Sequence, residues 1–266
     1  MHPFTYHCAK SVREASEQLR QFPDAKFLAG GMTLLSTMKQ GFAKPSHLID
    51  LTRIPELYAT THSNTCIQLG AAICHADVAA SELVRGTIGA LGNLALNIGD
   101  AQVRNRGTLG GSVANNDPAA DYSAAVLALG ATVVNDRRRL RADDFFQGMF
   151  TTALEADEVI ISIEFPIPRA ATYASFRHPV SGYAMAGAFV AKFDDAVRVA
   201  VTGAAPCAFR WREAEQCLSK RFSLAAVAAV APPEEATLDD LHAAAEYRAH
   251  LATEMLKRAV AQLAST

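Results

Sequence analysis

Hydrophobic and polar positions along the first sixty residues predict two helices set among short strands. Ser11 precedes a helical pattern that runs to about residue 19, and Glu14 three positions later completes a possible capping box. An extended segment at 26–29 leads through a double glycine into a second helical pattern at 34–40. Residues 48–51 have the composition of another buried strand. This order of strand, glycine, helix and strand predicts a small βαβ unit.

From about residue 60 the pattern changes. It predicts, in order, a strand at 66–70, a short helix at 77–83, a longer helix at 87–97, a polar stretch at 99–121, a helix leading into a strand at 124–134, a turn at Asn135-Asp136 and a strand at 158–165. Pro166-Ile167-Pro168 follows and is typical of a linker, because two prolines interrupt regular structure.

Beyond this linker the chain reads as a smaller, separate domain. Residues 187–193 and 197–202 are β-rich, and Asp194-Asp195-Ala196 between them predicts a hairpin. Two helical segments follow. The last is predicted to run from residue 237 or 239 almost to the end, after a break at Pro232-Pro233 and with Thr237 and Asp240 as its cap. Its stripe of Met and Leu is typical of a buried core face.

Composition excludes several classes of protein. The 266 residues are 50% hydrophobic and 20% charged, with a formal net charge of -2, so nothing favours binding to nucleic acid or to an anionic membrane surface. No secretory signal is visible, and the longest apolar tract, 224–231, is too short to span a bilayer. We therefore expect a cytoplasmic location. Trp211 is expected to be a packing residue, and no G-x-S-x-G elbow points to a hydrolase.

The sulfur and imidazole side chains do not form a metal-binding pattern. Five scattered cysteines contain no C-x-x-C pair, so we expect reduced structural thiols: Cys8, Cys66, Cys74, Cys207 and Cys217. Eight histidines lack H-x-x-x-H or H-x-H spacing, which favours surface or core positions over a metal site. Any redox role must therefore depend on a bound organic cofactor.

A first candidate loop lies between a predicted strand and a predicted helix, with the sequence Ala29-Gly30-Gly31-Met32-Thr33-Leu34. Two glycines let backbone N–H groups approach an anion closely, and the N-terminus of the next helix adds a favourable dipole. The segment matches neither a Walker loop nor G-x-G-x-x-G, which argues against a nucleoside triphosphatase or a Rossmann dehydrogenase. By itself it is also typical of an ordinary tight turn.

A second candidate loop, Gly107-Thr108-Leu109-Gly110-Gly111-Ser112, lies within the polar stretch and is followed by Asp117 and Asp121. Long loops inside compact domains are functional or disordered, and the apolar segments on both sides argue against disorder. Two glycine–hydroxyl loops suit the pyrophosphate of a dinucleotide approached from two sides, with a carboxylate left for ribose or adenine. The pair is more specific than either loop alone.

These loops resemble the FAD loops of the medium, flavin-binding subunits of the xanthine dehydrogenase and aerobic carbon monoxide dehydrogenase family. The resemblance rests on the first loop, on Ile98-Gly99-Asp100-Ala101-Gln102-Val103-Arg104-Asn105-Arg106-Gly107-Thr108-Leu109-Gly110-Gly111-Ser112, and on Asn115-Asn116-Asp117-Pro118-Ala119-Ala120-Asp121. It begins at Phe4-Thr5-Tyr6, includes Asp157-Glu158-Val159-Ile160, and ends with Asp240-Leu241-His242 and Glu246-Tyr247-Arg248. It therefore covers nearly the whole chain.

The resemblance implies an α+β fold: a two-subdomain FAD-binding domain of the PCMH type, followed by a smaller α+β C-terminal domain. On this chain the FAD-binding domain would span 1–168, with subdomains of about 1–57 and 58–168, and the C-terminal flavoprotein domain 169–266. It implies that a large molybdopterin subunit hydroxylates the substrate and that a small subunit relays electrons to FAD through two [2Fe–2S] clusters. The complex would be a dimer of heterotrimers.

The resemblance also assigns site residues. The pyrophosphate would be contacted, largely through backbone N–H groups, by Ala29, Gly30, Gly31, Met32, Thr33, Leu34, Thr108, Leu109, Gly110, Gly111 and Ser112. Asp121 would bind the ribose or adenine end. Ile98 and Ile160 would pack against the flavin, and Arg177 and Tyr183 would reach over the isoalloxazine, where a cation stabilises the anionic reduced form. Two positions differ from the family pattern. Relatives often carry glutamine or threonine where this chain has Met32, and some carry asparagine where it has Ser112.

The arginines Arg137, Arg138, Arg139 and Arg141 follow a predicted turn, which favours a solvated hairpin, with docking of a partner subunit as the alternative. For the whole chain the leading hypothesis is an electron-transfer flavoprotein subunit without a catalytic acid–base residue. A self-contained FAD-dependent oxidase or reductase is the alternative enzyme, and an assembly subunit that has lost FAD is the non-catalytic one. The substrate and the terminal acceptor, whether NAD, quinone or oxygen, are not encoded in recognisable motifs.

Overall fold

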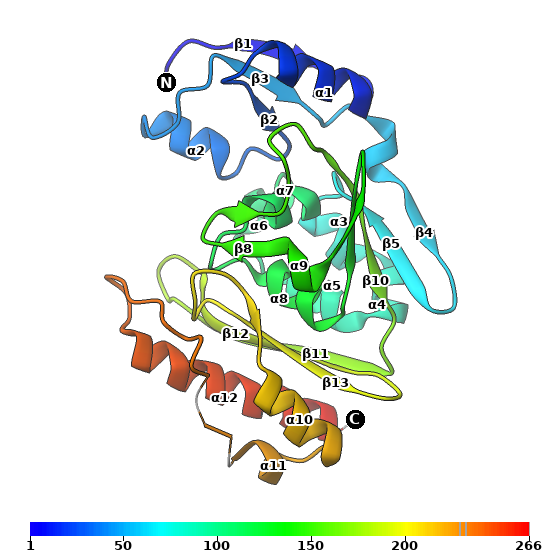
Figure 1. Cartoon of the computed structure of the whole chain (residues 1–266), viewed down its shortest axis with the longest axis vertical. Coiled ribbons are helices and arrows are strands. Elements are labelled where there is room, and N and C mark those ends of the chain that lie inside the picture. Colours follow the sequence, from blue (N-terminus) through cyan, green and yellow to red (C-terminus); the bar gives the residue numbers. More distant parts are fainter. Residues whose placement is uncertain (229, 232, 266) are drawn as a thin grey trace.

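The computed structural model describes every residue except 229, 232 and 266 (Figure 1). The chain forms three stacked parts, each with its own β-sheet. The largest hydrophobic cluster extends from the middle part onto the C-terminal sheet, where it includes Phe189, Ala191 and Ala200. The N-terminal sheet lies at one end of the long axis, a larger sheet with helices lies in the middle, and the C-terminal sheet lies at the other end (Figure 1). Within the described residues, the helices are all too short or too polar to cross a membrane.

The N-terminal part is a parallel sheet with the order β1-β3-β2, formed by β1 (Thr5–Cys8), α1 (Val12–Gln21), β2 (Lys26–Leu28), α2 (Leu34–Lys39) and β3 (His47–Asp50). The predicted strands and helices are confirmed. Ser11 caps α1 by accepting from the N–H of Glu14 at 3.2 Å, as predicted. The carboxylate of Glu14 accepts from the N–H of Lys10 rather than of Ser11, so the capping box is shifted by one residue.

The middle part contains a five-stranded antiparallel sheet, β4-β5-β10-β6-β7, with most of its helices packed together beside it. Its elements are η1 (Pro55–Tyr58), β4 (Thr60–His62), β5 (Cys66–Gly70), α3 (His75–Ala80), α4 (Glu82–Thr87), α5 (Gly89–Leu96), α6 (Ala101–Arg104), α7 (Leu109–Asn115), α8 (Asp121–Ala128), β6 (Thr132–Asn135), β7 (Arg139–Arg141), α9 (Ala142–Phe145), β8 (Phe146–Gly148), β9 (Thr151–Thr152) and β10 (Ile160–Pro166).

Local capping explains where this part differs from the sequence-based prediction. The stretch 99–121, predicted as a polar loop, contains α6 and α7, whose first turns are capped by the side chains of Asp100 and Thr108. The single short helix predicted at 77–83 is two helices, because Ser81 ends α3 and caps α4. Side-chain caps at three positions therefore outweigh the low helix propensity of the glycines.

The four arginines of the β6–β7 hairpin are all ion-paired. Arg138 lies 2.7 Å from Glu158, Arg139 pairs with Glu164, Arg137 pairs with Asp157, and Arg141 lies 3.8 Å from Asp143. These pairs join β7 and its turn to β10, to the residues before it and to α9. The geometry favours the solvated hairpin over docking of a partner, since each guanidinium already has a carboxylate.

The C-terminal part is an antiparallel sheet with the order β11-β12-β13-β14. Its elements are β11 (Ala170–Arg177), β12 (Ala184–Lys192), β13 (Val197–Thr202), β14 (Phe209–Arg210), α10 (Arg212–Lys220), α11 (Leu224–Ala228) and α12 (Ala245–Ala264). The predicted hairpin at 194–196 is confirmed, and Trp211 is buried as expected. α12 covers one face of the sheet, and α5 and α8 cover the other (Figure 1). The expected linker at 166–168 overlaps the last residue of β10, Pro166, and ends two residues before β11 begins at Ala170.

The start of the last helix was predicted too early. α12 begins at Ala245 and has no side-chain cap, so the expected cap of Thr237 and Asp240 is wrong. The carboxylate of Asp240 instead accepts from the N–H groups of His242 and Ala243 and from the guanidinium of Arg248. This Asx-type turn competes with helix formation. The predicted break at Pro232-Pro233 lies partly outside the described residues.

Candidate functional site

The two glycine loops predicted from the sequence lie against each other. A Cβ built on Gly30 would lie 2.0 Å from the carbonyl oxygen of Arg106, so this approach requires glycine. A Cβ built on Gly111 would lie 3.6 Å from that of Ala29. The fold thus brings the end of β2 to the start of α7, about eighty residues further along the chain.

The first loop presents a row of unused backbone donors. Gly31 adopts φ +73°, which turns the chain from β2 towards α2. The N–H groups of residues 30–34 donate no hydrogen bond to any residue that the structure describes. The side chains of Met32 and Thr33 are exposed, and the hydroxyl of Thr33 does not cap α2. Free N–H groups next to a glycine are the chemistry that binds a phosphate oxygen.

Most backbone N–H groups of the second loop already donate hydrogen bonds within the protein. The N–H groups of Leu109 and Gly110 donate to the carbonyls of Ile73 and Ala71 at 3.0 and 2.8 Å. Gly111 N–H donates to Thr108 Oγ1 at 3.1 Å, and Ser112 N–H donates to the Thr108 carbonyl. The expectation that residues 109–112 contact a pyrophosphate through N–H groups is therefore not supported by this geometry. The loop holds the first loop in place, and the half-buried Ser112 hydroxyl remains for a ligand.

His75 packs against the start of the second loop at Gly107. Its N–H donates to the Gly107 carbonyl at 3.0 Å, and its ring packs so closely that a Cβ on Gly107 would lie 2.6 Å from Nε2. Burial lowers the pKa of His75 to about 4, and the charge of Arg104 acts in the same direction. The ring also contacts Tyr122, at 5.4 Å between centroids. As expected for the histidines, this one is a core residue.

Asp121 and Arg177 form an ion pair inside the molecule. Oδ1 of Asp121 accepts from Nη2 of Arg177 at 2.9 Å and from the hydroxyl of Tyr173 at 2.6 Å. Burial raises the pKa of Asp121, while Arg177 and the hydrogen bond from Tyr173 oppose this shift. The sequence placed Asp121 at the adenine end of FAD and Arg177 at the ring. The ion pair therefore joins two residues that the sequence assigned to different ends of the cofactor, the ribose or adenine end for Asp121 and the ring for Arg177.

Arg177 also orders the loop that carries Tyr183. Its Nη1 donates to the Gly182 carbonyl at 2.8 Å, and the His178 N–H donates to the Tyr183 carbonyl at 2.9 Å. Tyr183 itself is 60% exposed. Burial of its hydroxyl and the charge of Asp117 raise its pKa. The loop that carries the exposed Tyr183 ring is therefore tied to the Asp121–Arg177 pair through Arg177.

The two isoleucines expected at the flavin pack with the same hydrophobic cluster but differ in exposure. Ile98 is half-buried and follows α5, where its carbonyl accepts from Arg104 at 3.1 Å. Ile160 is 5% exposed and belongs to the main hydrophobic cluster of the middle part. Tyr173 was missed by the sequence analysis. The alternation of β11, which puts Tyr173 and Arg177 on one face, is the signal that could have found it.

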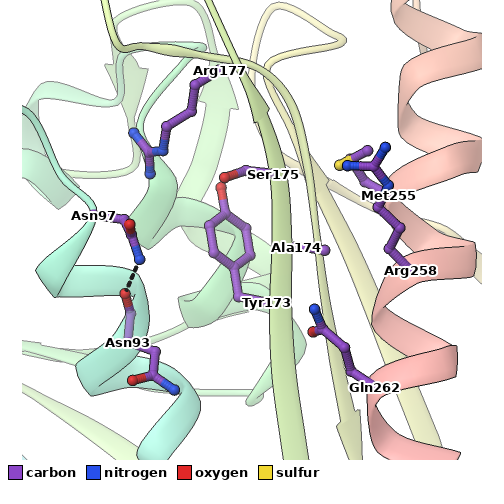
Figure 2. A pocket seen from close by; sticks show the side chains of 9 residues that line it. All are labelled: Asn93, Asn97, Tyr173, Ala174, Ser175, Arg177, Met255, Arg258 and Gln262. Carbon is purple, nitrogen blue, oxygen red and sulfur yellow. Dashed lines mark hydrogen bonds between the residues drawn. The ribbon is translucent and has the colours of Figure 1, made fainter.

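A cavity of about 320 Å³ opens beside Arg177, between α5, β11 and α12 (Figure 2). Its polar lining comes from Asn93, Asn97, Tyr173, Ser175, Arg177, Arg258 and Gln262. The described residues contain no cluster of three or more His, Cys, Asp or Glu side chains that could hold a metal. All five cysteines are free and half-buried.

Comparison with known proteins gives this geometry its context. Residues 2–168 match the family model of the FAD binding domain in molybdopterin dehydrogenase, and residues 173–263 match that of the CO dehydrogenase flavoprotein C-terminal domain. The chain is 38% identical to the carbon monoxide dehydrogenase medium chain of Hydrogenophaga pseudoflava, over 97% of this chain and 96% of that one. It is 32% identical to the nicotine 6-hydroxylase medium subunit of Paenarthrobacter nicotinovorans, with the same coverage.

Solved structures agree. Carbon monoxide dehydrogenase from Hydrogenophaga pseudoflava superposes with a TM-score of 0.88 at 37% identity, covering 97% of this chain and 96% of that one. Reconstituted CO dehydrogenase from Oligotropha carboxidovorans gives 0.91 at 30% identity, covering 98% of both chains. The fold and the paired glycine loops therefore define an FAD-binding flavoprotein. The chain belongs to the family of FAD-binding medium subunits of the molybdenum hydroxylases, which are oxidoreductase subunits.

Proposed function

We propose that this chain is the electron-transfer subunit of a molybdenum hydroxylase complex. It would take electrons from [2Fe–2S] clusters in a small partner subunit and pass them to an external acceptor, while a large molybdopterin subunit acts on the substrate. FAD supplies the redox chemistry. The observation that carries the proposal is the row of free N–H groups at residues 30–34, set against a second loop that fixes it.

The residues of the first loop fit a pyrophosphate. Phosphate oxygens accept hydrogen bonds from backbone N–H groups, and a buried or covered N–H without a partner costs free energy. The N–H groups of residues 30–34 have no acceptor among the described residues, and no carboxylate belongs to the loop. The hydroxyls of Thr33 and Ser112 add donors from the two sides. We assign the pyrophosphate to the N–H groups of the first loop, with Thr108 positioning the second loop rather than contacting the pyrophosphate.

We place the isoalloxazine end at Arg177 and Tyr183, and this moves Asp121 to the same end. Arg177 keeps one guanidinium nitrogen on Asp121 and another on Gly182, so its position is fixed before the cofactor binds. A fixed cation near the ring favours the reduced, anionic flavin. Ile98 fits a contact with the flavin ring because its side chain is half-buried and adjoins the turn at Gly99. Ile160 is buried, so it would have to contact the ring from within the hydrophobic core.

The partners follow from the relatives, which are medium chains or subunits of larger enzymes. We propose one large and one small subunit for each copy of this chain, as a dimer of heterotrimers. Five free thiols suit the reducing cytoplasm.

Two measurements test the proposal. Purified chain supplied with FAD should show a flavin absorption spectrum after gel filtration, at about one FAD per chain, and failure to retain any flavin would overturn it. In the assembled complex, substrate should reduce the flavin only when the small subunit carries its clusters. Turnover of an organic substrate by this chain alone would instead support the self-contained oxidase.

A further inference from the structure

β11 is an edge strand whose outer side is open. It pairs with β12 on one side, and no strand that the structure describes pairs with the other. The open side carries backbone N–H and C=O groups without ladder partners. Proteins usually protect such edges with proline, lysine or a bulge. β11 is eight residues long and contains neither proline nor lysine, and its irregularity is confined to the end at Phe176 and Arg177.

The cavity beside Arg177 runs along this open edge (Figure 2). Tyr173, Ala174 and Ser175 are consecutive and all line it. Successive side chains of a strand point to opposite faces, so a cavity lined by three in a row faces the edge of the strand and not one face of the sheet. Helices form its two walls: Asn93 and Asn97 come from α5, and Arg258 and Gln262 come from α12 (Figure 2).

The charge of this cavity is one-sided. Its described lining residues include two arginines and no aspartate or glutamate. Arg177 is compensated by Asp121. Arg258 is exposed and forms no hydrogen bond or ion pair with the described residues; it acts only at longer range, lowering the pKa of Glu254. One cation without an ion-pair partner among the described residues therefore lies at the rim of the cavity, and the open edge of β11 forms its floor.

We propose that β11 is a docking strand, to which an extended, acidic segment of a partner subunit adds as a further strand of the C-terminal sheet. Main-chain hydrogen bonds to β11 would supply affinity, and a carboxylate of the incoming segment would pair with Arg258. A segment of five residues spans about 17 Å, enough to follow the strand from Tyr173 to Arg177. This inference rests on the proposed function, because that function provides the partner subunits.

Hydrogen exchange tests the strand addition directly. Those backbone amides of residues 170–177 that point away from β12 should exchange at least about tenfold more slowly in the complex with the large and small subunits than in the isolated chain. Amides of β12 and β13 should be protected in both, since these strands are paired on two sides. A complex that assembles and holds FAD but leaves the exchange of β11 unchanged would overturn the docking strand while the proposed function stands.

Charge reversal tests the role of Arg258. Arg258→Glu should weaken assembly with the partner subunits by about tenfold and make it less sensitive to salt. Arg221→Glu is the matched control, an exposed arginine at the end of α10 on the same C-terminal part. Equal assembly by both variants would overturn the pairing.

Two further samples test whether something other than a partner subunit binds the open edge of β11. Isolated chain at rising concentration would protect β11 if a second copy were the occupant, and isolated chain with inorganic phosphate would do so if a small anion were. Either result overturns the inference. Loss of all flavin binding, by contrast, removes the proposed function itself.

Discussion

Arg177 donates from Nη2 to Oδ1 of Asp121 at 2.9 Å, and this ion pair joins α8 of the middle part to β11 of the C-terminal part. The hydroxyl of Tyr173 donates to the same oxygen. Because Arg177 also holds the carbonyl of Gly182, the pair connects the packing of two sheets to the loop that presents Tyr183. Changes at Asp121 should therefore reach both the stability of the chain and its hold on the flavin.

Asp121→Asn removes the charge and keeps the shape. The side chain of Asp121 is 7% exposed and that of Arg177 is 24% exposed, so the guanidinium loses its partner in a largely dry place. We expect the free energy of unfolding to fall by about 1–3 kcal/mol and FAD to dissociate more readily. Urea unfolding and flavin retention on gel filtration measure the two effects. Asp195→Asn, in the exposed hairpin turn, is the control, and equal behaviour of the two variants would contradict the assigned role.

Gly30→Ala should separate the two glycine loops. Its Cβ would meet the backbone carbonyl of Arg106 at 2.0 Å, and backbone cannot rotate away as a side chain can. We expect FAD occupancy to fall at least about tenfold, because the donors of residues 30–34 would move. Gly86→Ala in α4 is the matched control: its Cβ meets nothing within 4 Å, so stability should rise slightly. Full flavin occupancy in Gly30→Ala would show that the contact between the loops is unimportant.

Local signals account for the parts of the site that the sequence could predict. Gly30 and Gly31 follow a strand and precede a helix, and that arrangement depends on neighbours in the chain. The helices α6 and α7 were missed because glycines and polar residues dominate the stretch, whereas the caps at Asp100 and Thr108 and the burial of Leu109 decide the structure. Capping at both sites was readable in principle.

Long-range pairing accounts for what the sequence could not predict. Tyr173 and Asp121 are 52 positions apart, and only the packing of the C-terminal sheet on α8 brings them together. Asp240 also has a partner that the sequence pattern did not predict, although an aspartate at this position suits a helix cap. A buried arginine eight positions further along, Arg248, takes its carboxylate instead. Periodicity identifies which face of an element is buried, but not which polar group meets it there.

Arg248→Met tests that second pairing. Arg248 is 4% exposed and donates to the carbonyls of Met185 and Gly203 as well as to Asp240. Methionine fills the space but removes the donor from the carbonyls of Met185 and Gly203 and the ion-pair partner from Asp240, so we expect a loss of about 3 kcal/mol in urea unfolding. Arg221→Met, an exposed arginine, should change stability by less than about 0.5 kcal/mol. A loss no larger than this control's would mean that water replaces the guanidinium.

His75 should give the chain a specific dependence on pH. Its pKa in the folded state is about 4, below the ordinary 6.5, so the unfolded chain binds the proton more readily. Stability is therefore full above pH 6.5 and is lost as pH falls towards 4, by about 2 kcal/mol between pH 7 and pH 5. His75→Gln, which cannot titrate, should lack this slope in urea unfolding at the two pH values, whereas His62→Gln on exposed β4 should keep it. Parallel slopes in His75→Gln and the unmodified chain would place the titration elsewhere.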